Sequence, residues 1–173
     1  MTSDYEQMMV ELLEFKRSHH FGKYRGKVSD VDDPEGLGRL KASMEIWGGQ
    51  ESSWAWPAVP FAGPGHGLVL LPEVGDGVWI EFEAGKPDRP IWTGCWWARG
   101  ELPDPGGTKT RALVTSSGHR LVLDDGNNQV QLLHAGGAEL TMTNTDITLK
   151  IGATQVVLSA SGVNINNGAF QVR

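Results

Sequence analysis

Residues 138–173 read AELTMTNTDITLKIGATQVVLSASGVNINNGAFQVR, in which short apolar segments alternate with polar turn residues. Short strand-like segments recur in it about every eight or nine residues, and the pattern begins upstream at Arg111. Gly, Asn or Asp stands in nearly every gap between the segments, as expected of turn residues. Regular short strands of this kind predict stacked repeats that form a β-solenoid or a β-prism.

Several of these segments carry apolar side chains at alternate positions, which places those side chains on one face of a strand. The other face is polar: 11 of the 36 residues are Thr, Ser or Asn, which suits a wall in contact with water. The residues that we predict on the apolar side are Leu140, Met142, Ile147, Leu149, Ile151, Val163 and Ile165.

A ribbon with one apolar face and two open edges would aggregate rather than stay in solution. Three copies around a threefold axis would turn the apolar faces inward and pair the edges between chains. From residue 111 onward four basic residues balance four acidic ones, so charge repulsion does not oppose assembly. We therefore predict a homotrimer, with the seven residues named above as its core.

The preceding part of the chain, residues 21–100, predicts a small β-barrel. All 7 Trp lie between Trp47 and Trp97, and the segment Gly77-Val-Trp-Ile-Glu-Phe82 alternates with period two. Asp32-Asp-Pro-Glu-Gly36 is expected to be a turn between two strands, because Pro and Gly favour the required backbone angles. Short strands without helical patterns between them favour a closed barrel of the OB type.

The expected organisation is mainly β: a short N-terminal helix, an OB-fold barrel and a C-terminal intertwined trimeric β-helix or β-prism. The boundaries that we predict are 1–20 for the helix, 21–100 for the barrel, 101–110 for a Pro- and Gly-rich linker and 111–173 for the β-helical spike.

The expected helix begins with a capping-box pattern of Ser3 and Glu6. Apolar residues then follow at helical spacing, namely Tyr5, Met8, Met9, Leu12 and Leu13. Such a short helix is marginal alone and needs a surface to dock on. It packs either on its own domain or on a neighbouring subunit, and the sequence leaves both interpretations open.

Composition excludes several function classes. The net charge of −6 leaves no basic stripe of the kind that nucleic-acid binders use. Cys95 is the single cysteine, so an internal disulfide and a multi-cysteine metal site are excluded, and we expect it to be a small buried core residue rather than a reactive thiol.

We see no signal peptide and no apolar run near the ~20 residues of a membrane span. We expect synthesis in the cytoplasm, with release by a route that needs no signal.

Catalysis is not expected. Glu81 and Glu83 share the solvated face of a strand, and Asp124-Asp125 before Gly126, near His119, is a turn signal. No Ser/His/Asp or Cys/His signature is present, and we predict neither a cofactor nor a metal site.

An OB-fold binding module for single-stranded nucleic acid or oligosaccharide is the alternative, because several aromatic rings could stack on a ligand: Trp54, Trp56, Trp92, Trp96 and Trp97.

Several short sequence motifs in the predicted barrel resemble, in their order and spacing, those of a known family. They are Tyr24-Arg-Gly-Lys-Val28, Asp33-Pro-Glu-Gly-Leu-Gly-Arg39, Trp56-Pro-Ala-Val-Pro60, Leu71-Pro-Glu-Val-Gly-Asp76, Val78-Trp-Ile-Glu-Phe82 and Pro87-Asp-Arg-Pro-Ile-Trp-Thr-Gly94. The stretch resembles the OB-fold domain of phage baseplate assembly protein V and of the VgrG-type spikes of type VI secretion. With the β-repeat, the resemblance extends over most of the chain.

The resemblance implies a structural homotrimer in the baseplate of a phage tail or a related injection system, assembled in the bacterial cytoplasm. The OB domains would join a separate hub protein, and sheath contraction would drive the β-rod through the target membrane. At this length we expect no fused hub or inserted lysozyme domain, so the hub would be a separate protein. The chain also lacks the His-x-His near the C-terminus that holds a metal ion in some spike tips, since its last histidine is His134.

The final segment, Ala169-Phe-Gln-Val-Arg173, still alternates and shows no tapering loop. We therefore expect a blunt rod end whose unpaired strand edges bind a separate PAAR-type tip protein. The residues expected to contact that tip partner are Phe170, Val172 and Arg173.

Overall fold

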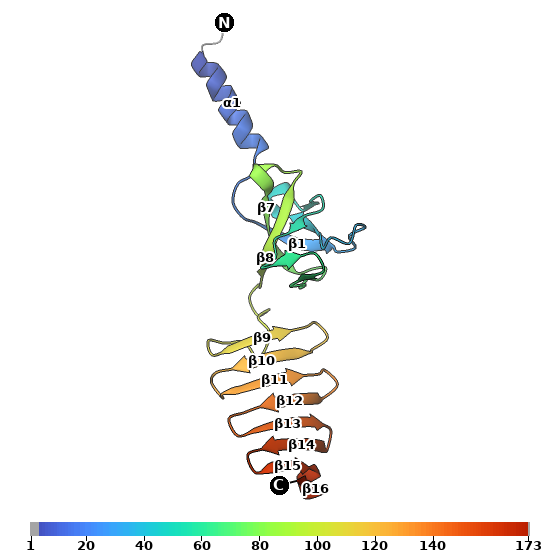
Figure 1. Ribbon diagram of the computed structural model, residues 1–173. Helices are drawn as coiled ribbons and strands as arrows, with labels where there is room; N and C mark the ends of the chain where they lie inside the picture. The colour runs from blue at the N-terminus through green and yellow to red at the C-terminus, as the bar shows by residue number, and fades with distance from the viewer. Residues whose placement is uncertain (1–3, 173) are drawn as a thin grey trace. The chain divides into compact units, whose positions relative to one another are not determined.

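The computed structural model describes residues 4–172 and divides the chain into two compact units, 1–101 and 102–173. The fold is mainly β, as predicted (Figure 1). The first unit contains α1 (Asp4–Ser18), β1 (Tyr24–Asp30), β2 (Lys41–Met44), η1 (Glu45–Trp47), β3 (Gln50–Glu51), β4 (Trp56–Pro57), β5 (Ala62–Gly63), β6 (His66–Gly67), β7 (Gly77–Phe82), η2 (Glu83–Gly85) and β8 (Pro90–Trp96).

Six of these strands form one curled sheet in the order β3-β2-β1-β7-β8-β4, and β5 and β6 form a separate small hairpin. The β4–β8 pair is parallel and the other pairs are antiparallel. The predicted turn after β1 connects β1 to its antiparallel neighbour β2. Gly26 of β1 allows their close approach, because a Cβ atom there would lie 3.0 Å from the Cβ atom of Ala42. The OB-type architecture that the sequence predicts is confirmed as a curled half-barrel, whereas the expected closure is not seen, because the end strands β3 and β4 do not pair with each other in the described residues.

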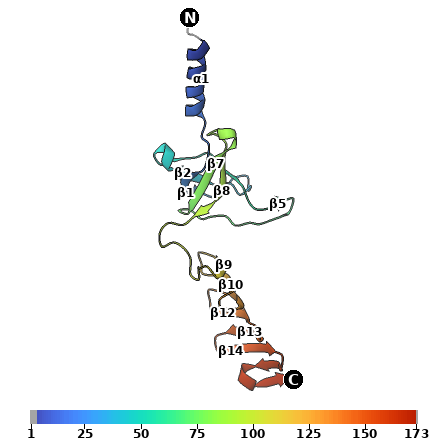
Figure 2. The same ribbon diagram turned by 90° about the vertical axis from the view of Figure 1, so that its left-hand side faces the viewer.

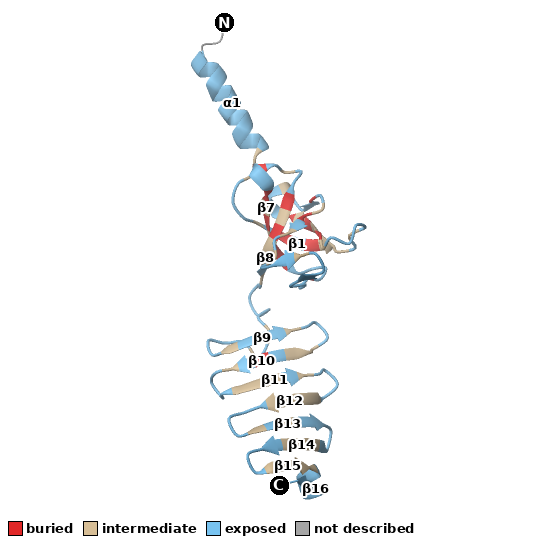
Figure 3. Ribbon diagram, viewed as in Figure 1, coloured by how far each residue is buried: buried red, intermediate tan, exposed pale blue. Residues whose placement is uncertain are grey.

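The core of the first unit lies inside the curled sheet, and it holds nearly all of the buried residues in the described chain (Figure 3). The alternation predicted for β7 is confirmed, because Val78, Ile80 and Phe82 are buried. Glu81 faces the other way and pairs with Lys23, with 2.9 Å between the carboxylate oxygen and Nζ. The core residues are Val28, Leu40, Ala42, Met44, Ala55, Val78, Ile80, Phe82 and Trp92.

The prediction that Cys95 is buried is wrong: its side chain is exposed. Cys95 lies three positions after the buried Trp92, and residues at odd separations along a strand project to opposite faces. The prediction rested on residue type alone and did not use this alternation. Partial desolvation, with a smaller contribution from Asp76, raises the pKa of the thiol, which is the opposite of activation.

The helix predicted near the N-terminus is α1, and none of its residues is buried. The apolar residues Tyr5, Met8 and Leu12 are all exposed, so the interpretation that α1 packs on its own domain is wrong for the single chain. Ser3 of the expected capping box lies outside the described residues. At residues 4–172 no helix has the length and apolar character needed to cross a membrane.

The second unit is a single antiparallel sheet of eight strands in which each strand pairs with the next along the chain (Figures 1 and 2). Its elements are β9 (Thr110–Val114), β10 (Arg120–Asp124), β11 (Gln129–Leu133), β12 (Ala138–Met142), β13 (Asp146–Ile151), β14 (Thr154–Ser159), β15 (Gly162–Ile165), η3 (Asn166–Gly168) and β16 (Phe170–Val172).

Strands β10 to β15 have both edges occupied by neighbours from the same chain. The expectation that strand edges pair between chains is therefore wrong for these six strands. Short turns connect the strands in sequence, so each hydrogen-bonded ladder is local. Val122 is the one buried hydrophobic residue described in this unit, which consequently has almost no core of its own.

Candidate functional site: the apolar face of the C-terminal sheet

The register of the second sheet brings the predicted core residues onto one face. Leu140 of β12 lies opposite Leu149 of β13, and Met142 lies opposite Ile147. Residues directly opposite each other in an antiparallel pair project on the same side of the sheet. Ile151 belongs to the same set because it is two positions beyond Leu149.

The next strands extend this face without a break. Val156 lies opposite Leu149 and Ile165 on its two sides, and Val163 is two residues before Ile165. Phe170 then lies opposite Ile165, and Val172 opposite Val163. The two residues assigned to tip contact thus share the face of the predicted trimer core, while Arg173 lies outside the described residues.

The first three strands contribute residues that sequence reasoning did not assign. Leu121 of β10 lies opposite Leu113 of β9 and Leu132 of β11, and Leu132 in turn lies opposite Leu140. The signal was obscured because Leu121, Val122 and Leu123 are three consecutive apolar residues. The complete apolar face consists of Leu113, Leu121, Leu123, Val130, Leu132, Ala138, Leu140, Met142, Ile147, Leu149, Ile151, Val156, Leu158, Val163, Ile165, Phe170 and Val172.

No residue of the apolar face is buried in the single chain (Figure 3). Ile151 is 63% exposed and Leu132 is 57% exposed. Both line a shallow, open hollow of about 420 Å³ over β11 to β14. Folded monomers rarely expose a continuous apolar surface that spans a whole sheet, and such surfaces mark sites of association. The apolar face is therefore the principal candidate site of this chain.

The opposite face of the sheet is more polar, although it also carries the buried Val122 together with Leu133 and Val157. Its central positions include Gln131, Thr141 and Thr148, which lie opposite one another on β11, β12 and β13. Lys150 and Glu139 form a cross-strand ion pair at 3.2 Å on the same side. The two faces thus differ in chemistry along the sheet, which makes the sheet amphipathic.

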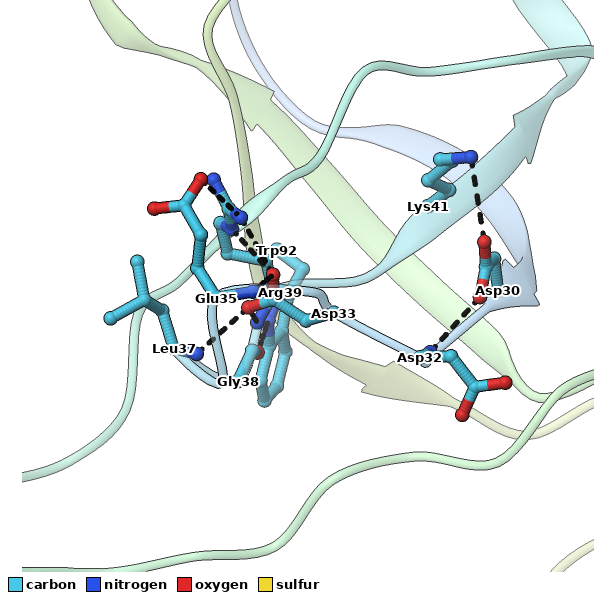
Figure 4. A network of polar contacts seen from close by, with 9 residues as sticks. All are labelled: Asp30, Asp32, Asp33, Glu35, Leu37, Gly38, Arg39, Lys41 and Trp92. Atoms are coloured by element: carbon cyan, nitrogen blue, oxygen red, sulfur yellow. Dashed lines mark hydrogen bonds and ion pairs between the residues drawn. The ribbon is translucent and has the colours of Figure 1, made fainter.

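In the first unit, an ion pair fixes the loop between β1 and β2 (Figure 4). Asp33 Oδ1 accepts from Arg39 Nη2 at 2.6 Å, and both side chains are almost completely buried. The second carboxylate oxygen of Asp33 accepts from the backbone amides of Leu37 and Arg39. Glu35 also pairs with Arg39, at 2.9 Å. The Arg39 guanidinium, aided by the backbone amides, lowers the pKa of Asp33 strongly.

This loop is attached to the core by Trp92, whose indole nitrogen donates to the backbone oxygen of Gly38 at 3.1 Å. Gly36 and Gly38 both have positive φ, so the loop can turn back on itself to bring Asp33 to Arg39. The sequence indicated only a turn at this place. In the structure, the turn is held by a buried ion pair in which the charges of Asp33 and Arg39 compensate each other.

Two of the five tryptophans considered for stacking are engaged within the barrel, and a third lies beside an arginine that is already paired. Trp92 is buried, and Trp96 donates from its indole nitrogen to the backbone oxygen of Val78. Trp56 is exposed, and the guanidinium of Arg39 lies 5.6 Å from its ring. That guanidinium is already paired with Asp33, so it is not available to bind a phosphate. The arrangement does not favour the alternative function of a nucleic-acid or sugar-binding module.

The carboxylates considered for catalysis are separated and locally paired. Glu83 pairs with Arg89 at 3.6 Å, apart from the Glu81–Lys23 pair. Asp124 caps a turn by accepting from Asn127 and Gly126, and these hydrogen bonds lower its pKa. Among residues 4–172 no group of three or more His, Cys, Asp or Glu side chains is placed to hold a metal ion.

An OB-type sheet and a second β-sheet with one exposed apolar face define a two-unit β protein with a large candidate association surface. Comparison with known families agrees. Residues 24–97 match the "Type VI secretion system/phage-baseplate injector OB domain", and residues 111–171 match the "Phage baseplate V C-terminal trimerisation domain". The chain belongs to the family of phage baseplate protein V and the VgrG-type spikes, and its apolar face lies within the trimerisation domain.

Among curated proteins, the chain is similar to the type VI secretion system spike protein VgrG4b of Pseudomonas aeruginosa. The two are 35% identical over 77 residues, which is 44% of this chain and 8% of the relative. The chain thus aligns with less than a tenth of the relative's length. This likeness supports the family alone.

Proposed function

We propose that this chain is the central spike of a contractile phage tail or phage-tail-like injection system, and that it acts mechanically, without catalysis. The observation that carries the proposal is the apolar face, which spans all eight strands of the second unit. In a homotrimer, three such faces would meet on the threefold axis and leave the three polar faces in water. This arrangement would give the sheet the core that a single chain lacks.

A prism of this kind suits a mechanical role. Eight strands at a spacing of ~4.8 Å extend over roughly 34 Å along the stacking direction. Consecutive strands are hydrogen-bonded within each chain, and the apolar contacts would join the chains to one another. Unfolding any one chain would then expose the faces of all three, which opposes bending and unfolding under load.

The first unit is proposed to attach the spike to a baseplate hub protein. It exposes apolar side chains in the segment around β5 and β6, where Phe61 is 57% and Val69 is 79% exposed. Leu70 and Leu71 continue this exposed segment. An apolar loop on a barrel with its own satisfied core is typical of a docking surface.

The far end of the sheet is proposed to carry a PAAR-type tip protein, and contraction of the sheath would drive this end through the target envelope. In residues 4–172, β16 pairs with β15 on one side and has no strand partner on the other. A free strand edge offers backbone groups to a partner that continues the sheet. Phe170 and Val172 would close the apolar core beside that partner.

The experiment is to produce the particle with Leu149→Asp in place of the natural chain, beside Thr141→Asp on the polar face as the matched control. We expect normal particles with Thr141→Asp. With Leu149→Asp we expect particles that lack density on the baseplate axis and no longer kill or inject. Fully active particles with a normal axial spike in Leu149→Asp would contradict the proposed function.

A further inference from the structure

α1 carries an apolar surface that the described residues of the chain do not cover. Leu12 is 58% exposed, and Tyr5, Met8 and Phe15 are exposed to similar degrees. Phe15 stacks on His19, with ring centroids 4.1 Å apart, but half of its surface remains open. A helix of 15 residues with this surface in water is marginal by itself and needs a partner.

The spacing of these residues identifies the kind of partner. Tyr5, Met8, Leu12 and Phe15, here called the α1 seam, follow one another at steps of three, four and three residues. This is the a and d pattern of two heptads, which forms the seam of a coiled coil. Met9 is at the e position beside the seam, so a bundle of three helices would cover more of it than a pair.

The charges beside the α1 seam favour a parallel arrangement of identical helices. Glu11 is at a g position and Lys16 is at the e position five residues later. In parallel coiled coils these two positions form ion pairs between neighbouring helices. Within the chain, Glu11 accepts a long hydrogen bond of 3.4 Å from Gln7, on the same helix. Threefold symmetry also requires the helices to be parallel.

We propose that α1 forms a parallel three-helix coiled coil with α1 of two further copies of this chain. The inference rests on the homotrimer of the proposed function and adds a second, N-terminal interface to it. Two heptads are too few to associate strongly alone. Copies already joined through the trimerisation domain are held at a high effective concentration, which removes most of the entropic cost of association.

Disulfide trapping in the full chain tests this proposal. In a Cys95→Ser background, Leu12→Cys places a thiol in the seam, and Val10→Cys places one at the outward f position. In the single chain Val10 is 53% exposed and Leu12 is 58% exposed. The two thiols therefore differ mainly in whether α1 of another copy lies beside them. After mild oxidation, Leu12→Cys should give a strong disulfide-linked dimer on a non-reducing gel, and Val10→Cys a faint one.

Light scattering on the same samples distinguishes a failure of the coiled-coil inference from a failure of the proposed homotrimer. A trimer in which Leu12→Cys cross-links no better than Val10→Cys overturns the coiled coil and leaves the spike intact, whereas a monomer overturns both. Cross-linking of Leu12→Cys to a hub protein in purified particles, in place of a second copy, also overturns the inference.

Charge reversal tests the predicted ion pair. In the Leu12→Cys background, Glu11→Lys or Lys16→Glu should lower the cross-linking yield, and the double reversal should restore it. Both positions lie on the surface, so neither change threatens folding. A double reversal that stays as low as the single ones overturns the pairing of Glu11 with Lys16.

Discussion

Leu149→Asp places a carboxyl group in the middle of the apolar face. Leu149 lies opposite Leu140 on one side and Val156 on the other, and it is 45% exposed in the single chain. The single sheet can therefore accommodate the substitution with the new carboxyl in water. The homotrimer cannot, because three copies of that carboxyl would be enclosed near the threefold axis.

The cost of the charge exceeds the cost of the lost contacts. Complete burial of a Leu side chain stabilises by about 1.5–3 kcal/mol, and roughly half of that remains to be gained on assembly, so the lost contact costs about 1 kcal/mol per chain. The cheapest way to bury the carboxyl is to protonate it. At pH 7, against an ordinary pKa of about 3.9, protonation costs about 4 kcal/mol for each copy. Three copies then cost on the order of 12 kcal/mol, comparable to the whole stability of a domain.

Light scattering measures the result directly. At pH 7 we expect Leu149→Asp to have the mass of one chain, 18.8 kDa. Thr141→Asp, on the polar face, should keep the trimer mass of about three times 18.8 kDa. Lowering the pH toward about 4 removes most of the protonation cost, so Leu149→Asp should recover part of its trimer there. Trimers of Leu149→Asp that form and melt like the wild type at pH 7 would show that this face is not the trimer core.

Three further predictions concern the first unit. Ile80→Ala opens a cavity at a fully buried site and should lower the free energy of unfolding of this unit by about 2–5 kcal/mol without changing the oligomeric mass; unchanged urea denaturation would contradict it. The lowered pKa of Asp33 stabilises the fold above the unfolded-state pKa and is lost on acidification, so the wild type should melt at lower temperature below about pH 4. Asp33→Asn should be less stable at neutral pH and show a flatter dependence in that window, and equal pH slopes would exclude this role. Cys95→Ser should change stability by less than about 0.5 kcal/mol, and the thiol should react with iodoacetamide faster as the pH rises above 8; a thiol that alkylates only after denaturation would contradict its exposure.

The sheet could be predicted where side chains follow a strict local rule. Period two in residues 138–151 assigns each side chain to a face before any partner strand is known, and the observed register placed Leu140, Leu149 and Ile151 together as expected. The same rule failed around Val122, because three consecutive apolar residues do not reveal which ones share a face. In the structure, Val122 is buried on the opposite side from Leu121 and Leu123.

Burial of Cys95 was predicted from its residue type alone and is wrong, because Cys95 lies at an odd offset from the buried Trp92 along β8. Features that depend on nonlocal geometry could not be predicted. The ion pair of Asp33 with Arg39 depends on the path of the loop between them, so the sequence indicated a turn without its charges. Phe170 was assigned to a tip by its position near the chain end, whereas the β15–β16 hairpin aligns it with Ile165 on the apolar face.

We expect this chain to work as a homotrimer that buries its apolar face, and the decisive measurement is the mass of the wild-type chain in solution. Light scattering on dilute, full-length protein should give about three times 18.8 kDa, independent of concentration over the measured range. A stable, soluble species of 18.8 kDa that keeps its apolar face in water would contradict the account.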